Sequence, residues 1–206
     1  MRGISGVVFD FGGVMTLTTM PERVRAITEE LGVPWKVLEA GYGRYRRVMD
    51  GGFLTIAELY DLIWADADLD VDADKKAQIV KADVASFMCR NERTLAWMRA
   101  LKSRGLRIGI LTNMPPEFAV EFRRAFPDFI AEADAMVISG EEKMFKPQRR
   151  IYELLASRIG LAPGELCFVD DSPANCEGAL AAGWRAAVRF TSNDQAEREL
   201  ETVLNG

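Results

Sequence analysis

Several side chains that could do chemistry stand where an apolar run of this sequence ends, or soon after it. Three positions follow such a run directly and one follows a loop: Asp10, Thr112-Asn113, Asp170-Asp171 and Lys146. A carboxylate at the end of a buried strand is costly to place unless something uses its charge. Taken singly, each residue has an ordinary interpretation as a turn, a helix cap or a solvated side chain. Their recurrence at successive strand ends favours one shared site.

The acidic residues fit phosphoryl transfer at a metal ion. Asp10 and Asp171, with Asp170 behind them, would supply carboxylate oxygens for Mg²⁺, and the Gly12 carbonyl could add another ligand. Carboxylates this close together need a cation to stay ionised. Asp10, oriented by the metal, would then be the nucleophile. Gly12 and Gly13 let the backbone turn sharply and approach a ligand closely.

The other candidates are suited to holding a phosphate group. Thr112 and Asn113 are expected to bind phosphate oxygens, through the Thr112 hydroxyl and nearby backbone N–H groups. Lys146 would add positive charge as the transition state forms. Lys146 is therefore expected to be catalytic as well as phosphate-binding.

Composition narrows the chemistry further. The 206 residues include no histidine, which excludes imidazole bases, His-based triads and H-E-x-x-H zinc sites. Any metal is expected to be a hard, oxygen-preferring ion. The three cysteines lack a C-x-x-C spacing and indicate reduced thiols of a cytoplasmic protein.

Charge and hydropathy indicate which partners to expect. The net charge of −5 argues against binding nucleic acid or an anionic membrane. No apolar run is long enough for a transmembrane helix, and no signal peptide is apparent. We expect a cytoplasmic protein whose partner is a small phosphorylated metabolite, with its oligomeric state left open.

The predicted elements place the candidate residues on one edge of a sheet. Apolar, β-branched runs predict strands at about 4–9, 107–111, 135–138, 166–169 and 184–190. Helical patterns separate the last four strands, which predicts an α/β fold with a doubly wound parallel sheet, a Rossmann-like core. In such sheets, ligands bind beyond the carboxyl ends of the strands.

The segment after the first strand differs, because it contains no convincing strand for about 70 residues. Four helices are predicted there, at 21–31, 34–49, 55–64 and 72–88, the third with a capping box at Thr55 and Glu58. We therefore divide the chain into an α/β catalytic core, 1–16 and 90–206, and an all-helical cap, 17–89, placed as a lid. The alternative is a helical extension packed elsewhere.

Four motifs resemble those of the haloacid dehalogenase-like hydrolase superfamily with a helical cap of the C1 type. They are Phe9-Asp10-Phe11-Gly12-Gly13-Val14, Leu111-Thr112-Asn113, Lys146-Pro147 and Phe168-Val169-Asp170-Asp171-Ser172. The resemblance covers nearly the whole chain. It implies an aspartyl-phosphate on Asp10, phosphoryl binding by Thr112 and Lys146, and Mg²⁺ at Asp171. The segment 169–175 further resembles a subgroup of sugar-phosphate phosphatases that includes enzymes acting on hexose 1-phosphates.

The chain departs from the superfamily pattern at Gly12. Most phosphatases of the superfamily place a second Asp there, which protonates the leaving oxygen and later activates water. Losing such a group costs about 10²–10⁴ in rate. The departure leaves several possibilities: a substrate with a good leaving group, an acid supplied by the cap or by water, or a different reaction. The sugar-1-phosphatase-like subgroup shares this glycine.

The predicted cap contains a cluster of aromatic and basic residues at 42–47 that could face the cleft and hold a substrate. Alternatively, its tyrosines pack inward while its arginines face water. The Asp50–Phe53 stretch is predicted to be a loop between two helices.

The sequence thus predicts a Mg²⁺-dependent phosphatase acting on a small phosphorylated metabolite, with a sugar phosphate as the first candidate. Two alternatives remain. A hydrolytic 2-haloacid dehalogenase also uses an Asp and a Lys, but it needs no metal and would leave Asp170 and Asp171 without a purpose. A phosphate-binding module without catalysis would account for Gly12.

Overall fold

The computed structural model of the chain describes residues 3–17 and 20–206, and contains a five-stranded, all-parallel sheet in the order β3-β2-β1-β4-β5. The strands are β1 (Gly6–Phe9), β2 (Arg107–Thr112), β3 (Ala135–Ile138), β4 (Leu166–Asp170) and β5 (Ala186–Arg189). The predicted parallel α/β sheet is therefore confirmed, with a somewhat shorter β5 than expected.

The register of the sheet aligns the strand ends that carry the candidate residues. Gly6 of β1 lies opposite Arg107 of β2 and Leu166 of β4, and Phe9 lies opposite Ile110 and Val169. The Asp10 N–H continues this ladder by donating to the Val169 carbonyl, 2.9 Å away. The residues that follow β1, β2 and β4 consequently meet at one edge.

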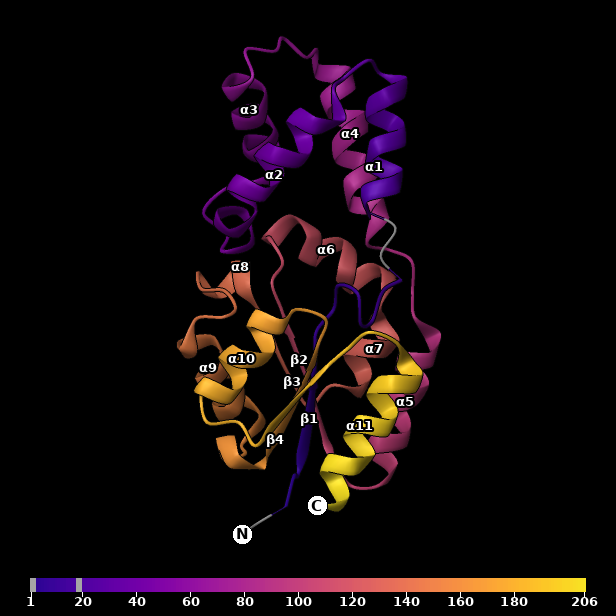
Figure 1. Ribbon diagram of the computed structural model, residues 1–206, viewed down its shortest axis with the longest axis vertical. Helices are drawn as coiled ribbons and strands as arrows, with labels where there is room; N and C mark the ends of the chain where they lie inside the picture. The colour runs from indigo at the N-terminus through magenta and orange to yellow at the C-terminus, as the bar shows by residue number, and fades with distance from the viewer. Residues whose placement is uncertain (1–2, 18–19) are drawn as a thin grey trace.

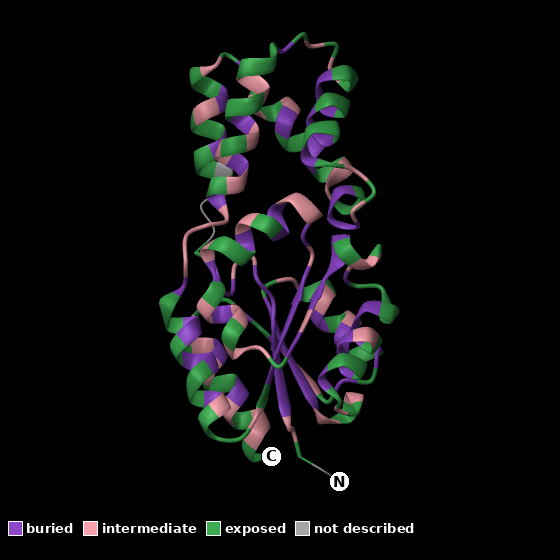
Figure 2. Cartoon of the chain, turned by 180° about the vertical axis from the view of Figure 1, so that it is seen from behind, coloured by how far each residue is buried: buried purple, intermediate pink, exposed green. Residues whose placement is uncertain are grey.

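Helices cover both faces of the sheet, as expected for a doubly wound fold (Figure 1). One face carries α5 (Glu92–Ser103), α6 (Pro116–Ala125), α7 (Pro127–Glu132) and α11 (Asn193–Asn205), and the other carries α9 (Arg149–Ile159) and α10 (Pro173–Ala181). Val7 and Phe9 of β1 pack into the first hydrophobic cluster, and Val8 packs into the second. Figure 2 shows the strands buried between these layers.

Some short elements, and one longer helix, are absent from the sequence-based prediction. They are α7, α8 (Ser139–Glu142), the 3-10 turn Pro163–Glu165 and the C-terminal helix α11. Helices of one turn have too few residues to show a hydrophobic period. The longer α11 did carry a signal, because Ser192 caps it by accepting the Gln195 N–H, and Ala196 and Leu200 are buried on one face.

The segment between β1 and α5 forms a helical insert of four helices. They are α1 (Met20–Glu30), α2 (Trp35–Asp50), α3 (Ile56–Asp66) and α4 (Ala73–Ser86), and no strand occurs among its described residues, 20–86. Within the insert α1 packs against α4, and α2 against α3. Thr55 and Glu58 form the predicted capping box at the start of α3.

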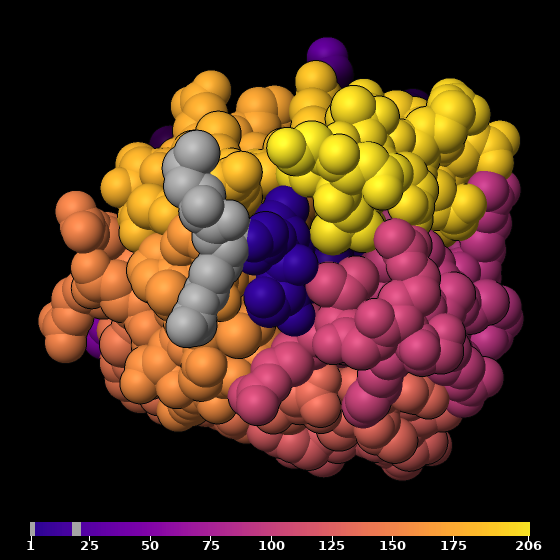
Figure 3. Space-filling model, turned by 90° about the horizontal axis from the view of Figure 1, so that it is seen from below, coloured from indigo at the N-terminus to yellow at the C-terminus, as the bar shows by residue number. Residues whose placement is uncertain are grey.

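The helical insert lies above the carboxyl edge of the sheet (Figure 1). The two segments that connect it to the core pair with each other in one antiparallel bridge between Thr16 and Arg90, in which Leu17 N–H donates to the Cys89 carbonyl and Asn91 N–H donates to the Met15 carbonyl, both at 2.8 Å. From the opposite side, the first described residues emerge between α11 and α5 (Figure 3). The division into a catalytic core and a cap remains our proposal. In the described part of the chain, no helix is both long and apolar enough to cross a membrane.

A buried carboxylate holds the interior of the helical insert together. Asp83 of α4 is fully buried and accepts hydrogen bonds from the Tyr60 hydroxyl of α3, at 2.9 Å, and the Tyr42 hydroxyl of α2, at 3.2 Å. Burial raises the pKa of Asp83 to about 6, although nearby Arg46 and the two tyrosines oppose the shift.

This carboxylate should make stability depend on pH. Because the folded-state pKa of Asp83 is raised, its contribution to stability is full below about pH 4 and is lost as pH rises through about 6. Between pH 5 and 7, the free energy of unfolding should fall by about 1 kcal/mol through this group alone. Asp83→Asn keeps an acceptor for the tyrosines and should lack that part of the slope. Urea unfolding at both pH values measures it, and equal slopes in the two proteins would contradict the assignment.

Candidate active site

The Lys146 ammonium lies at the centre of the site. Its Nζ atom is 2.7 Å from Asp10 Oδ1 and 2.7 Å from Asp170 Oδ2, and it donates to the Leu111 carbonyl at 3.1 Å. Lys146 is only 2% exposed and Asp170 is fully buried. One cation from the loop before α9 thus joins the ends of β1, β2 and β4.

Burial sets the protonation behaviour of this ion pair. It raises the pKa of Asp10 to about 7, because the attraction of Lys146 only partly offsets the loss of solvation. Burial on its own would lower the pKa of Lys146, but the charges of Asp10 and Asp170 outweigh it and raise the pKa to about 12. Lys146 therefore stays positively charged at neutral pH.

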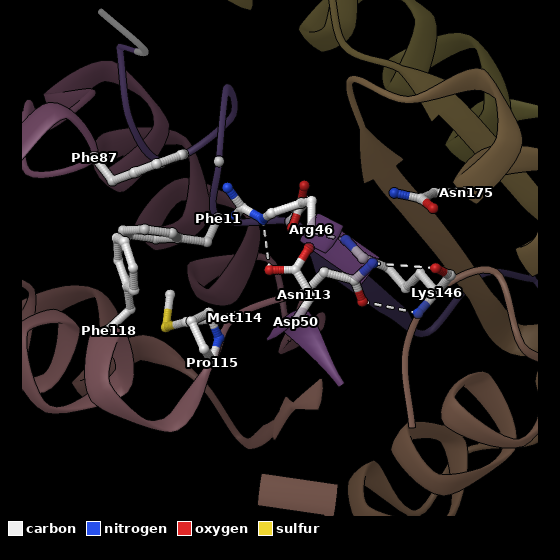
Figure 4. Close-up of a pocket in the computed structure, with 12 residues that line it drawn as sticks. Phe11, Arg46, Asp50, Phe87, Asn113, Met114, Pro115, Phe118, Lys146 and Asn175 are labelled. Atoms are coloured by element: carbon white, nitrogen blue, oxygen red, sulfur yellow. Dashed lines mark hydrogen bonds and ion pairs between the residues drawn. The ribbon is translucent and has the colours of Figure 1, made fainter. Parts of the chain in front are cut away.

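Asn113 fixes the backbone that carries Lys146. Its Oδ1 accepts the Lys146 N–H at 2.8 Å, and its Nδ2 donates to the Lys146 carbonyl at 3.1 Å (Figure 4). This amide, expected to bind phosphate, is engaged in positioning the lysine. Thr112, just before it, is buried at the end of β2. Phosphate binding by Thr112 and Asn113 stays a prediction.

Asp170 is held from several sides. Its Oδ1 accepts the Ser172 N–H at 2.8 Å, while Asn175 Nδ2 lies 3.0 and 3.1 Å from its two oxygens. The Tyr152 hydroxyl donates to the Asn175 carbonyl at 2.8 Å and fixes the start of α10. The sequence alone predicted no role for Asn175, although this residue ends the segment 169–175 that resembles a subgroup of sugar-phosphate phosphatases.

The three predicted metal-binding aspartates come together. Asp10, Asp170 and Asp171 each offer a carboxylate oxygen, and these atoms lie within 4.8 Å of one another. Although Asp171 reaches the surface, the surrounding protein and the Asp170 carboxylate raise its pKa. This all-oxygen set fits a hard cation such as Mg²⁺, which would offset the repulsion among the three charges.

The two glycines after Asp10 have different structural requirements. Gly13 adopts a φ of +76°, and a Cβ atom there would lie 2.8 Å from Asp171 Oδ2. Only glycine suits that position, since L-residues are strained at positive φ. At Gly12 the nearest atom to a Cβ would be a Phe87 ring carbon at 3.8 Å. Gly12 therefore has room for a side chain that the sequence does not supply.

A cavity of about 250 Å³ lies between the sheet edge and the helical insert. Asp10, Lys146 and Asn113 line it from below, and Arg46 and Asp50 of α2 line it from the helical insert (Figure 4). The apolar part of its wall comes from Phe11, Phe87, Met114, Pro115 and Phe118.

Some residues of the aromatic and basic cluster at 42–47 face the cavity, whereas others follow the alternative of inward-packing tyrosines and solvent-facing arginines. Tyr42 is buried, while Arg44 and Arg47 are exposed, as inward packing predicts. Arg46 instead turns into the cavity and pairs with Asp50 at 2.6 Å. The sequence placed Asp50 at the start of a predicted loop and gave it no individual role, whereas the structure makes it the last residue of α2. The only local signal was its spacing of four residues from Arg46, which is common on solvent-facing helices.

Hydrogen bonds attach the Asp50 segment to the core. The Ser139 hydroxyl donates to the Asp50 carbonyl and accepts the Met114 N–H at 2.8 Å. Lys143 Nζ donates to the Gly52 carbonyl, and Gly52, at φ +70°, lies too close to the Gly140 backbone to carry a Cβ. The wall of the cavity formed by α2 is therefore fixed relative to the sheet.

Comparison with known proteins agrees with the fold and the arrangement of the site. A family model for haloacid dehalogenase-like hydrolases matches residues 4–183. The chain belongs to this family. A phosphatase of Mycobacterium tuberculosis is 28% identical over 192 residues, which is 89% of this chain and 86% of that protein.

Solved structures of the haloacid dehalogenase-like family share the fold. An enzyme of this family from Bacteroides thetaiotaomicron, in complex with magnesium and inorganic phosphate, superposes with a TM-score of 0.71. It is 22% identical, and the match covers 93% of this chain and 96% of that one. An L-2-haloacid dehalogenase superposes with a TM-score of 0.73 at 16% identity over the full length of both chains.

The glycine pair offers a direct test of the loop after β1 in this family member. Gly13→Ala should lower the free energy of unfolding by about 1–2 kcal/mol, because of its positive φ, and should displace the Asp171 carboxylate. The matched variant Gly12→Ala should stay within about 0.5 kcal/mol of the parent protein. Thermal unfolding with and without Mg²⁺ measures both effects. Similar losses in the two variants would refute the distinction.

Proposed function

We propose that this protein is a Mg²⁺-dependent phosphatase that hydrolyses a small phosphorylated metabolite through an aspartyl-phosphate on Asp10. The observation that carries the proposal is the buried Lys146 ammonium, paired with Asp10 at 2.7 Å beside two further carboxylates at the mouth of a cavity. The similarity to a phosphatase, with 28% identity over 89% of this chain, adds support.

The residues divide the chemistry between them. Asp10 attacks phosphorus, and Lys146 stabilises the negative charge that develops on the phosphoryl oxygens. The Thr112 hydroxyl and the backbone near Asn113 complete the phosphate site. Asp170 keeps Lys146 in place through the second ion pair.

The carboxylates of Asp10 and Asp171, with the Gly12 carbonyl and Asp170 beside them, would hold the Mg²⁺ ion. When bound, Mg²⁺ supplies positive charge to the phosphoryl group and keeps Asp10 ionised.

The cavity suits a small substrate with both polar and apolar faces. Its volume is about 250 Å³, and it combines the Arg46 and Asp50 side chains with aromatic walls from Phe87 and Phe118. Sugar phosphates are the first candidates, because their hydroxyl groups can bond to the charged pair while their ring carbons pack on aromatic side chains.

Hydrolytic dehalogenation is the second candidate, favoured by the fold shared with an L-2-haloacid dehalogenase. That reaction needs no metal and gives no role to Asp171, which offers a carboxylate oxygen within 4.8 Å of those of Asp10 and Asp170. Binding of phosphate without turnover is the third candidate.

Activity measurements on a panel of phosphorylated metabolites and 2-haloacids separate these functions. We expect turnover of phosphates with Mg²⁺ and its loss with a chelator. Asp10→Asn and Asp171→Asn should each lower kcat by at least about 10³-fold, since they remove the nucleophile and a metal ligand.

Asp61→Asn is a suitable control, because Asp61 lies on the surface of α3 and pairs only with Lys76 among the interactions described for it. It should leave turnover unchanged. Full activity of Asp10→Asn would refute the mechanism, and haloacid turnover that survives chelation would favour the dehalogenase. A folded protein that binds phosphate but turns over none of the panel would indicate the binding module.

A further inference from the structure

None of the proposed roles of the core residues includes protonation of the leaving group. Gly12 has no side chain, and Asp10 and Lys146 are occupied as nucleophile and charge partner. Among the described residues that line the cavity, the remaining ionisable side chains are Arg46 and Asp50. Arginine does not give up its proton in proteins. Asp50 is therefore the one group left on this wall that can both donate and accept a proton.

The position of Asp50 suits that role. In an in-line displacement the leaving oxygen departs from the face of phosphorus opposite the nucleophile. Asp10 approaches from the sheet edge, so the leaving oxygen points toward the helical insert. Asp50, the last residue of α2, lies in that wall and is only 6% exposed. Its backbone is attached to Ser139 of the core, which fixes its distance from the phosphate site.

The side chain of Asp50 is also oriented. Arg46 Nε bonds to Asp50 Oδ1 at 2.6 Å, which leaves Oδ2 available to a substrate. Arg46 is itself held by the Tyr42 hydroxyl at 2.5 Å and lies over the Tyr42 and Phe87 rings at 5.2 and 5.3 Å. Tyr42 bonds in turn to the buried Asp83. The carboxyl group of Asp50 is therefore presented by a rigid hydrogen-bonded chain through the helical insert.

We propose that Asp50 is the general acid and general base of this enzyme, acting from the helical insert in place of a side chain at Gly12. The inference rests on the proposed phosphatase function. Protonated Asp50 gives its proton to the leaving oxygen as the P–O bond breaks and the Asp10–phosphorus bond forms, which releases an alcohol. Ionised Asp50 then takes a proton from the water that attacks the aspartyl-phosphate, which releases phosphate and restores both carboxyl groups.

The electrostatic surroundings are compatible with a carboxyl group that holds its proton. Burial raises the pKa of Asp50, while Arg46 on the same helix and Lys146 of the core oppose the shift. The other ionisable groups near this pair are Tyr42 and Asp83, which interact with Arg46. Repulsion between the Asp50 and Asp83 carboxylates contributes to the raised pKa of Asp83.

A general acid at Asp50 widens the range of phosphate esters that the enzyme can hydrolyse. With a glycine after the nucleophile and no other acid, only a good leaving group, such as an anomeric, acyl or aryl phosphate, would depart readily. An acid at Asp50 extends the range to phosphate esters of ordinary alcohols, whose leaving oxygen must be protonated.

The test compares Asp50→Asn with the parent protein on two substrates, 4-nitrophenyl phosphate and an alkyl phosphate such as a sugar 6-phosphate. We expect kcat/KM, which reports the first displacement, to fall by about 10²–10⁴-fold for the alkyl phosphate and by less than about tenfold for the aryl phosphate. Because both substrates form the same aspartyl-phosphate, whose hydrolysis loses its base, kcat should fall for both. The parent protein's rate on the alkyl phosphate should decline at high pH as Asp50 loses its proton, and the variant should lack that limb. Asp61→Asn should match the parent on both substrates.

A second variant guards against a merely structural effect. Because Gly12 has room for a side chain, adding Gly12→Asp to Asp50→Asn should restore at least part of the alkyl phosphatase activity. Equal losses of kcat/KM on both substrates, no loss on either, or no recovery in the double variant would overturn the inference while leaving the phosphatase intact. Failure of the parent protein to turn over either substrate would instead overturn the proposed function, and the inference with it.

Discussion

The buried Lys146 ammonium and its two carboxylate partners are the constraint on which the rest of the structure depends. A charge with 2% exposure is several kcal/mol too costly unless it is paired with good geometry. Asp10 and Asp170 provide that pairing at 2.7 Å each, from two neighbouring strands. Removing the Lys146 ammonium would leave both buried carboxylates uncompensated, at a cost of about 3–5 kcal/mol. The same pairing that compensates the charge of the lysine also fixes the carboxylate of Asp10, the proposed nucleophile.

The sheet satisfies this constraint through its register. β1 lies between β2 and β4, so that Asp10, Thr112 and Asp170 end their strands side by side. Asn113 clamps the backbone of Lys146 through both atoms of its amide. Since Asp10, Lys146 and Asp170 are joined by ion pairs and Asn113 is hydrogen-bonded to Lys146, the proposed phosphate site is preorganised and would exert its electrostatic effect without rearrangement.

The helical insert contributes the opposite wall and with it a separate part of the chemistry. The core carries the charges proposed to bind the phosphate group. Helix α2 instead places Arg46 and Asp50 where they would meet the organic part of a phosphorylated substrate. Fixing the insert through Ser139 and Gly52 brings these groups to the core and narrows the access of water. In the proposed mechanism the catalytic groups come from both the core and the insert, so the reaction would depend on the contact between these two parts.

The sequence by itself determined the parallel α/β sheet, the four helices of the insert and the residues at the strand ends, because these follow from short-range patterns. Strand ends such as Asp10 and Asp170 are recognisable from apolar runs next to a charge, and the capping box at Thr55 is local as well. Tertiary structure alone decided that Arg46 turns inward, that the Asn113 amide serves Lys146, and that Gly13 is needed for its conformation while Gly12 has space. These features arise where segments far apart in the sequence come together, as Asn113 meets Lys146, Asp50 meets Ser139 and Gly13 meets Asp171. No local pattern encodes such contacts, since they depend on how the insert packs over the sheet.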